Sequence, residues 1–170
     1  MATPFKVICA DCPWSFGDKL PGKSRGAEKN YAVMSIEDIC NFPLPPIADD
    51  AYLFMWRVSS QVEEAYRVVR AWGFVPKSEI IWRKLTSNGN PWFGMGRSVR
   101  ASHETCIIAT RGRPVRKSAS VRSVFDASVG RHSAKPEVFY DLVEQLSDGP
   151  YVELFARRQR PGWTCIGLEL

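Results

Sequence analysis

The residues best suited to chemistry lie near the start of the chain, in the tetrapeptide Asp11-Cys12-Pro13-Trp14. The apolar run at 7–9 just before them is predicted to be a buried central strand, because such runs closed by turn residues usually are. The tetrapeptide would then follow the carboxyl end of that strand, where open α/β sheets place their ligands. An acid, a backbone kink and a flat aromatic ring at this point predict a pocket for a planar base.

One reaction that these residue types could serve is the modification of the exocyclic amine of a bound adenine. The N6 lone pair is delocalised into the ring, so acceptors that bind both N–H bonds would draw it out of conjugation. Asp11 and the main-chain oxygen of Cys12 are two such acceptors. Pro13 would fix the turn, and Trp14 would offer a stacking face worth about 1–3 kcal/mol. A methyl group could then pass directly from a sulfonium donor, with catalysis resting on positioning and hydrogen bonding.

The tetrapeptide also fits a simpler alternative, a strand that ends in an Asp-Pro turn with a tryptophan in the core. Four residues alone do not decide between these two interpretations. The elements that would position them, and the rest of the composition, are therefore needed.

The composition predicts one globular domain over residues 1–170. The chain is 45% hydrophobic and 12% aromatic, enough for one core but not for two domains. No apolar stretch approaches the ~20 residues of a membrane span, and the N-terminus lacks the layout of a signal peptide. Cys9 and Cys12 lie three apart, but no second pair completes a metal site. We expect reduced thiols, no metal, no membrane partner and a cytoplasmic location, in a bacterium or a phage-infected host cell.

The formal net charge of +5 is concentrated in four turn-rich segments rather than on helix faces. These segments are 19–29, 97–100, 111–122 and 157–160. Basic loops are typical of proteins that grip a phosphate-bearing ligand or a nucleic acid, and a solvated rim is an equal alternative.

Strand and helix patterns alternate along the chain, which predicts an α/β fold with a mostly parallel sheet covered on both faces. Ser35 is expected to cap a short helix to about Asn41, and Ser59 or Ser60 a helix to Trp72. A third helix is expected from Pro136 to Leu146. Further strands are expected at 51–56, 78–83, 104–110, 121–125, 151–155 and 163–168, with long loops at 15–33 and 85–99.

The tetrapeptide resembles the D-P-P-W motif of the adenine-N6 methyltransferases. These form the family of the mRNA N6-adenosine methyltransferase catalytic subunit and its small bacterial and phage relatives. Similar segments follow in order over nearly the whole chain. They are 26–31 (GAEKNY), 53–56 (LFMW), 79–84 (EIIWRK), 100–104 (RASHE), 133–136 (SAKP), 153–157 (ELFAR) and 161–163 (PGW). Ordered matches over this length are far more specific than the tetrapeptide.

The resemblance implies a Rossmann-like methyltransferase fold and S-adenosylmethionine as the methyl donor. Lys135 would meet the donor carboxylate beside a helix N-terminus, and Glu153 would accept the ribose hydroxyls. Phe155, Arg157 and Gly167, with neighbouring backbone, would complete the cofactor pocket. Taken singly, Lys135 also fits a solvated lysine at a helix start, and Glu153 a surface acid paired with an arginine.

Other positions of the resemblance would lie near the target nucleotide. These are Tyr31, Lys84, Arg100 and His103. Methyl transfer to a neutral amine needs no strong base, so His103 is expected to position rather than to catalyse. Two departures stand out, Cys12 in place of the first motif proline and Leu168 where relatives often have asparagine.

The sequence therefore predicts an adenine-N6 methyltransferase that acts on nucleic acid, with DNA preferred over RNA because the compact chain resembles bacterial and phage members. A base inside a duplex would have to flip out to reach the pocket. The alternatives are an RNA adenine-N6 methyltransferase and a non-catalytic nucleic-acid-binding subunit. Cytosine-N4 methylation is disfavoured by the acid at Asp11. A monomer or a homodimer would be consistent with the sequence.

Overall fold

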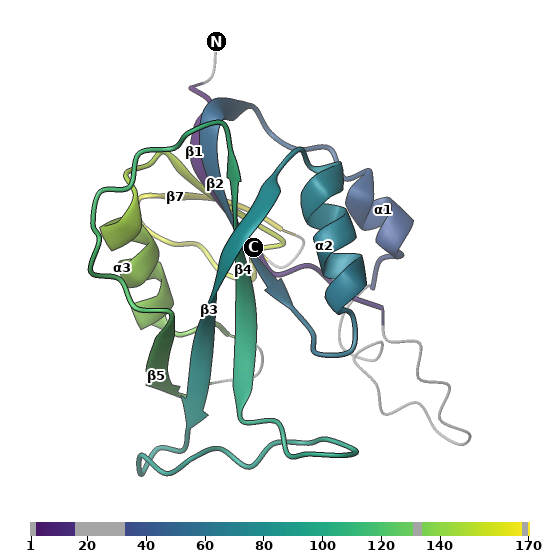
Figure 1. The fold of residues 1–170 in the computed structure, drawn as a ribbon, viewed down its shortest axis with the longest axis vertical. Coiled ribbons are helices and arrows are strands. Elements are labelled where there is room, and N and C mark those ends of the chain that lie inside the picture. Colours follow the sequence, from purple (N-terminus) through teal and green to yellow (C-terminus); the bar gives the residue numbers. More distant parts are fainter. Residues whose placement is uncertain (1–2, 16–32, 131–133, 168–169) are drawn as a thin grey trace.

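The computed structural model describes residues 3–15, 33–130, 134–167 and 170, and its centre is a seven-stranded sheet (Figure 1). The strands are β1 (Phe5–Ala10), β2 (Ile47–Arg57), β3 (Val75–Leu85), β4 (His103–Arg111), β5 (Val124–Ser128), β6 (Tyr151–Leu154) and β7 (Trp163–Ile166). The helices are α1 (Ile36–Cys40), α2 (Val62–Ala71) and α3 (Glu137–Leu146). The strand order is β5-β3-β4-β2-β1-β6-β7.

The sheet is mostly parallel, as expected. Strand β1 runs parallel to both of its neighbours, β2 and β6, and the pairs β6–β7 and β3–β5 are also parallel. Strand β4 is antiparallel to β2 and to β3. The other six described strands therefore point the same way, and their carboxyl ends meet at one edge of the sheet.

Helices cover both faces of the sheet, which confirms the predicted Rossmann-like arrangement (Figure 1). Alternate residues of β1 divide between two cores, as the pleat of a strand requires. Ile8 and Ala10 pack in the core that holds α1 and α2, whereas Val7 and Cys9 pack in the core that holds α3. All four side chains are buried, which is why β1 reads as a continuous apolar run.

The helix starts were predicted with mixed success. Ser35 caps α1 as expected, because its hydroxyl accepts a hydrogen bond from the Asp38 backbone N–H at 3.1 Å. The serine cap expected for the second helix is wrong. Helix α2 begins at Val62, after Gln61, and its N-terminus has no side-chain cap. Helix α3 follows Pro136, close to the predicted start.

Several strands differ in length from the prediction. β2 and β3 begin earlier than expected. The start of β2 pairs with β1, where Phe5 lies beside Ile47, and the start of β3 pairs with β4, where Val75 lies beside Thr110. β5 lies at 124–128 rather than 121–125, where it pairs with the end of β3. β7 ends at Ile166 instead of Leu168. None of the described helices is long and apolar enough to cross a membrane.

Candidate active site

The topology brings the predicted site residues to a switch point of the sheet. The chain leaves β1 towards β2 on one side, whereas β6, the other neighbour of β1, is reached from α3 on the opposite face. Open α/β sheets bind ligands at such points, outside the carboxyl ends of the strands. Asp11 directly follows β1 and therefore lies at this position.

A cavity of about 380 Å³ opens there, within the size range of small-molecule sites. All four residues of the tetrapeptide line it, together with the end of β2, the end of β3, the start of β4 and the segment before α3. The predicted residues that it brings together beyond the tetrapeptide are Lys84, His103, Lys135 and Arg157.

The turn after β1 is held rigidly by backbone hydrogen bonds. The Cys12 carbonyl accepts a bond from the Trp14 N–H at 2.9 Å, and the Pro13 carbonyl accepts one from the Met34 N–H at 2.9 Å. Trp14 is only 4% exposed, and its indole Nε1 donates to the Trp56 carbonyl at 3.2 Å. Trp14 is thus both a core residue and a wall of the cavity, so the two interpretations of the motif are compatible.

Cys12 occupies the place of the first proline of the D-P-P-W motif, and its thiol is not a reactive group of the cavity. Its side chain is buried in the core that holds α2. Burial, followed by the nearby Asp11 charge, raises the thiol pKa well above its usual value, so the group stays protonated.

Four charged side chains form an alternating series along the cavity wall. The Lys135 ammonium lies 3.2 Å from a carboxylate oxygen of Asp11 and 2.5 Å from one of Glu104. Glu104 in turn pairs through its other oxygen with Lys84, also at 2.5 Å. The Lys135 side chain is 9% exposed and also lies over the Trp56 ring, 4.8 Å from its centroid.

The pairing of these groups outweighs the effect of their burial. Burial alone would raise the pKa of Glu104, but Lys135 and Lys84 together hold it below its usual value. Burial alone would lower the pKa of Lys135, but Asp11 and Glu104 raise it. Glu104 and Lys135 are therefore both ionised at neutral pH, and each lies against a side chain of opposite sign.

Glu153 lies on β6 beside Cys9 of β1 and is buried on the α3 face. Its carboxylate accepts a hydrogen bond from the Tyr140 hydroxyl at 2.6 Å. Burial raises the pKa of Glu153, with the bond from Tyr140 acting in the opposite direction. Glu153 is therefore neither a surface acid nor one of the residues that line the cavity beside Asp11.

Two of the residues predicted to complete the cofactor pocket have clear packing roles. Phe155 adopts a left-handed backbone conformation, with φ of 59°, and its ring packs on Phe42 with centroids 4.6 Å apart. A side chain at Gly167 would bring its Cβ to within 1.9 Å of the Ala156 carbonyl oxygen. Only glycine fits where the chain passes so close to the loop after β6.

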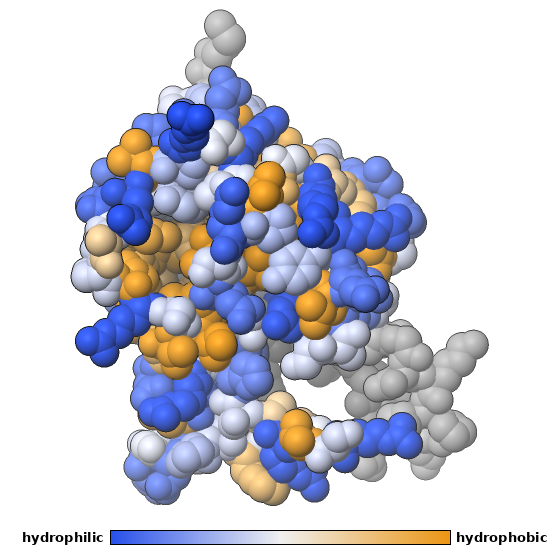
Figure 2. All heavy atoms as spheres, in the orientation of Figure 1, coloured by the Kyte–Doolittle hydropathy of each residue, from blue (hydrophilic) through white to orange (hydrophobic). Residues whose placement is uncertain are grey.

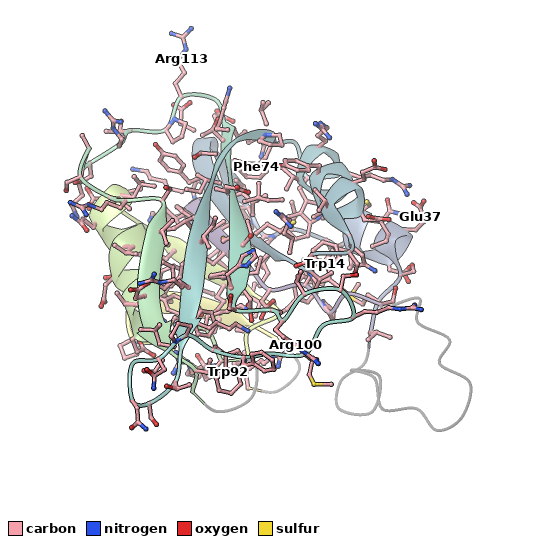
Figure 3. All side chains as sticks on the ribbon, turned by 60° about the horizontal axis from the view of Figure 1, so that its bottom comes forward. Trp14, Glu37, Phe74, Trp92, Arg100 and Arg113 are labelled. Atoms are coloured by element: carbon pink, nitrogen blue, oxygen red, sulfur yellow. The ribbon has the colours of Figure 1, made fainter. Side chains whose placement is uncertain are left out.

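Two predicted substrate-binding residues are not part of this cluster. Arg100 is exposed on the loop between β3 and β4, where its guanidinium lies over the Phe93 ring at 5.2 Å. Figure 3 shows Arg100 and Trp92 on the same side of the molecule as Trp14. Tyr31 lies outside the described residues.

Sequence reasoning missed Glu104 and Trp56 as site residues. Glu104 is an acid at the head of an otherwise apolar strand pattern, and this was the available signal for it. Trp56 ends the apolar run of β2, and nothing in the sequence relates it to Lys135 or Trp14. Over the described part of the chain, no group of His, Cys, Asp and Glu side chains could hold a metal ion.

Comparison with known proteins decides the family. A family model described as MT-A70 matches residues 5–169. The chain belongs to the MT-A70 family. This confirms the resemblance that the tetrapeptide and the later segments indicated.

Relatives in the family include long and short proteins. The human N(6)-adenosine-methyltransferase catalytic subunit METTL3 is 28% identical over 178 residues, which cover 98% of this chain and 28% of METTL3. The Drosophila melanogaster N(6)-adenosine-methyltransferase MT-A70-like protein is 28% identical over 178 residues, or 98% of this chain and 27% of that protein. The type II methyltransferase M.MunI of a Mycoplasma species is 27% identical over 187 residues, or 98% of this chain and 78% of that protein.

Proposed function

We propose that this protein transfers a methyl group from S-adenosylmethionine to the N6 amine of adenine in DNA. The observation that carries the proposal is the position of Asp11. Its carboxylate lies at the switch point of the sheet, on a cavity walled by Trp14, and is paired with the buried Lys135. The names of the N(6)-adenosine-methyltransferase relatives support adenine as the target, and these names and that of the type II methyltransferase M.MunI support methyl transfer as the reaction.

The residues around Asp11 suit the recognition of a neutral amine. The Asp11 carboxylate accepts one N6–H bond and the Cys12 carbonyl, which has a second lone pair beside its bond to Trp14, accepts the other. Lys135 neutralises Asp11 in the resting site and prevents two carboxylates from repelling each other there. Because the cavity is partly shielded from water, these hydrogen bonds are worth more than they would be in bulk solvent.

The cavity also fits the charged end of the methyl donor, which supplies an activated methyl group on sulfur when bound. Lys135 and Arg157 both line the cavity and would hold the donor carboxylate. The segment of 134–136 leads into α3, whose N-terminus favours an anion. Glu153 would hold the ribose, because a carboxylate that accepts one bond from Tyr140 can accept others.

The choice of DNA over RNA rests on the similarity to bacterial members of the family, of which the type II methyltransferase M.MunI of a Mycoplasma species is one.

Incubation with labelled donor and separate DNA and RNA pools, followed by nucleoside analysis, tests the proposal. We expect N6-methyladenine in the DNA pool. Label found only in RNA would contradict the choice of DNA, and N4-methylcytosine alone would overturn the reaction. Absence of donor binding by calorimetry would favour a non-catalytic nucleic-acid-binding subunit.

A pair of variants tests the role of Asp11. Asp11→Ala should abolish methylation while leaving donor binding largely intact, because the residue contacts the base rather than the donor. Asp141→Ala, on the exposed side of α3, is the matched control and should retain full activity. Full activity in Asp11→Ala would refute the role assigned to the carboxylate.

A further inference from the structure

A second cavity of about 360 Å³ lies on the α3 face of the sheet and shares no lining residue with the first. It lies between the first half of β3, the end of β4 and the segment 112–123, and Leu146 of α3 borders it. Strands rise about 3.3 Å per residue, so Ser78 in this cavity is about 20 Å along β3 from Lys84 in the first. Figure 2 shows apolar surface set back between hydrophilic groups on the side of α3.

The walls of this second cavity are fixed by specific contacts. The segment 112–123 is tied to α3, because the Lys117 N–H donates to the Leu146 carbonyl at 2.8 Å and the Gln145 amide donates to Ser120 at 3.1 Å. The Lys117 ammonium also contacts Asp148 at 2.8 Å. The segment is therefore a strap with a defined position over the sheet.

The floor of the cavity is apolar and its rim is basic. Tyr52, Ile80 and Ile108 form the floor. Arg116, Arg122 and Lys77 stand at the rim, and all three are exposed. The register between β3 and β4 shifts between Pro76 and Ser78, so Lys77 has no partner in the regular ladder with β4.

These rim cations have no carboxylate partners among the described residues, unlike most of the other site and surface cations. Arg57, Arg67, Arg83, Lys84, Lys117, Lys135, Arg158 and Arg160 all form ion pairs. Among the described residues, the only acid that lines the second cavity is Glu79, and its carboxylate pairs with Arg57 at 3.7 Å. Three cations without an ion pair therefore surround an apolar floor, together with four hydroxyl residues, Ser78, Thr110, Ser118 and Ser123.

We propose that this cavity binds a nucleotide unit, with its phosphate on the basic rim and its base on the apolar floor. Arginine suits phosphate because its planar fork can donate two parallel hydrogen bonds. The volume is enough for one such unit and too small for a longer segment of nucleic acid. The unit is either a free mononucleotide or one nucleotide of a bound strand, since both present the same chemistry.

Matched arginine variants of the full-length chain test this site without any methyl donor, so the result does not depend on methyl transfer. Arg116→Gln removes a rim cation. Arg113→Gln makes the same change in the same strap, but Arg113 points into solvent (Figure 3) and does not line the cavity. Asp11→Ala reports on binding in the first cavity. The probes are adenosine 5′-monophosphate, adenosine and a short single-stranded oligodeoxynucleotide, titrated by calorimetry at several salt concentrations.

We expect Arg116→Gln to weaken adenosine monophosphate binding about tenfold, with Arg113→Gln close to the wild type. Adenosine without phosphate should bind more weakly to the wild type and should not distinguish the arginine variants. If the natural ligand is one nucleotide of a bound strand, Arg116→Gln should also reduce the steepness of the plot of log K against log salt concentration for the oligonucleotide by about 0.7. If the natural ligand is a free mononucleotide, this slope should not change. Equal effects of the two arginine variants on adenosine monophosphate binding, or an effect of Asp11→Ala alone, would overturn the proposal. Lys77→Gln, at another position of the rim, provides a second test by the same titrations.

Discussion

Replacing Lys135 by methionine should destabilise the fold by leaving two carboxylates without their shared cation. Methionine keeps the apolar part of the side chain against Trp56 but removes the ammonium, which lies within 3.2 Å of both Asp11 and Glu104. Breaking a buried ion pair costs about 3–5 kcal/mol. Because the carboxylates are 22% and 28% exposed and Lys84 still pairs with Glu104, we expect a loss of about 2–3 kcal/mol.

The loss should depend on pH in a direction that the pairing determines. The pKa of Glu104 is lowered in the folded state, so its stabilising contribution is present above its unfolded pKa and is lost as the pH falls through the folded value. The pKa of Lys135 is raised, so its contribution is lost only as the pH rises through its folded value. Lys135→Met should therefore cost most near neutral pH, and the cost should fall as the pH drops below the usual carboxyl range and through the lowered pKa of Glu104.

Urea unfolding of Lys135→Met and wild type near neutral pH and in acid measures this difference. Lys117→Met is the matched control, because its partner Asp148 is exposed and the pair should contribute little. Adding Glu104→Gln to Lys135→Met should recover part of the lost stability, since one unpaired charge disappears. The reasoning would be refuted if Lys135→Met cost no more than Lys117→Met, or if its cost were the same at both pH values.

Three further predictions concern the fold around the site. Gly167→Ala should lower the stability by about 1–3 kcal/mol, because its Cβ would meet backbone atoms. Gly130→Ala is the control and should not lower it, because a Cβ there would have nothing within 4 Å. Calorimetric melting of the two variants measures the difference. Tyr140→Phe should cost about 1–3 kcal/mol and raise the pKa of Glu153 further. The native state of this variant would then keep Glu153 protonated at a pH at which the unfolded state has lost that proton. Urea unfolding should therefore show a greater loss of stability at neutral than at acidic pH. Ser35→Ala removes the α1 cap and should cost about 1 kcal/mol by urea unfolding; no change would show that the cap contributes little.

Local patterns in the sequence were sufficient to predict the elements that carry the site. The apolar run of β1 and the amphipathic pattern of α3 depend on neighbouring residues alone, so their positions could be read directly. The direction of β4 could not be read in this way, because an apolar strand pattern is the same in either direction. The position of β5 was wrong for a related reason, since it depends on pairing with the distant end of β3.

The contacts within the site depend on the tertiary fold. Lys135 and Asp11 are far apart in the sequence, and only the strand order brings them together. For the same reason, only the fold identifies Glu104 as the second carboxylate partner of Lys135. The hydrogen bond between Tyr140 and Glu153 joins a helix to a strand, and no spacing rule predicts it.

The reversed direction of β4 has a consequence for how the protein could acquire new specificity. Because β4 runs against its neighbours, its first residues lie at the same edge as the carboxyl ends of β1, β2 and β3. The loop from 86 to 102, which joins β3 to β4, therefore starts and ends at the rim of the cavity. An insertion or deletion in this loop would reshape the entrance without altering either core. Such a hairpin connection can be exchanged between relatives as a unit, leaving the chemistry beneath it unchanged.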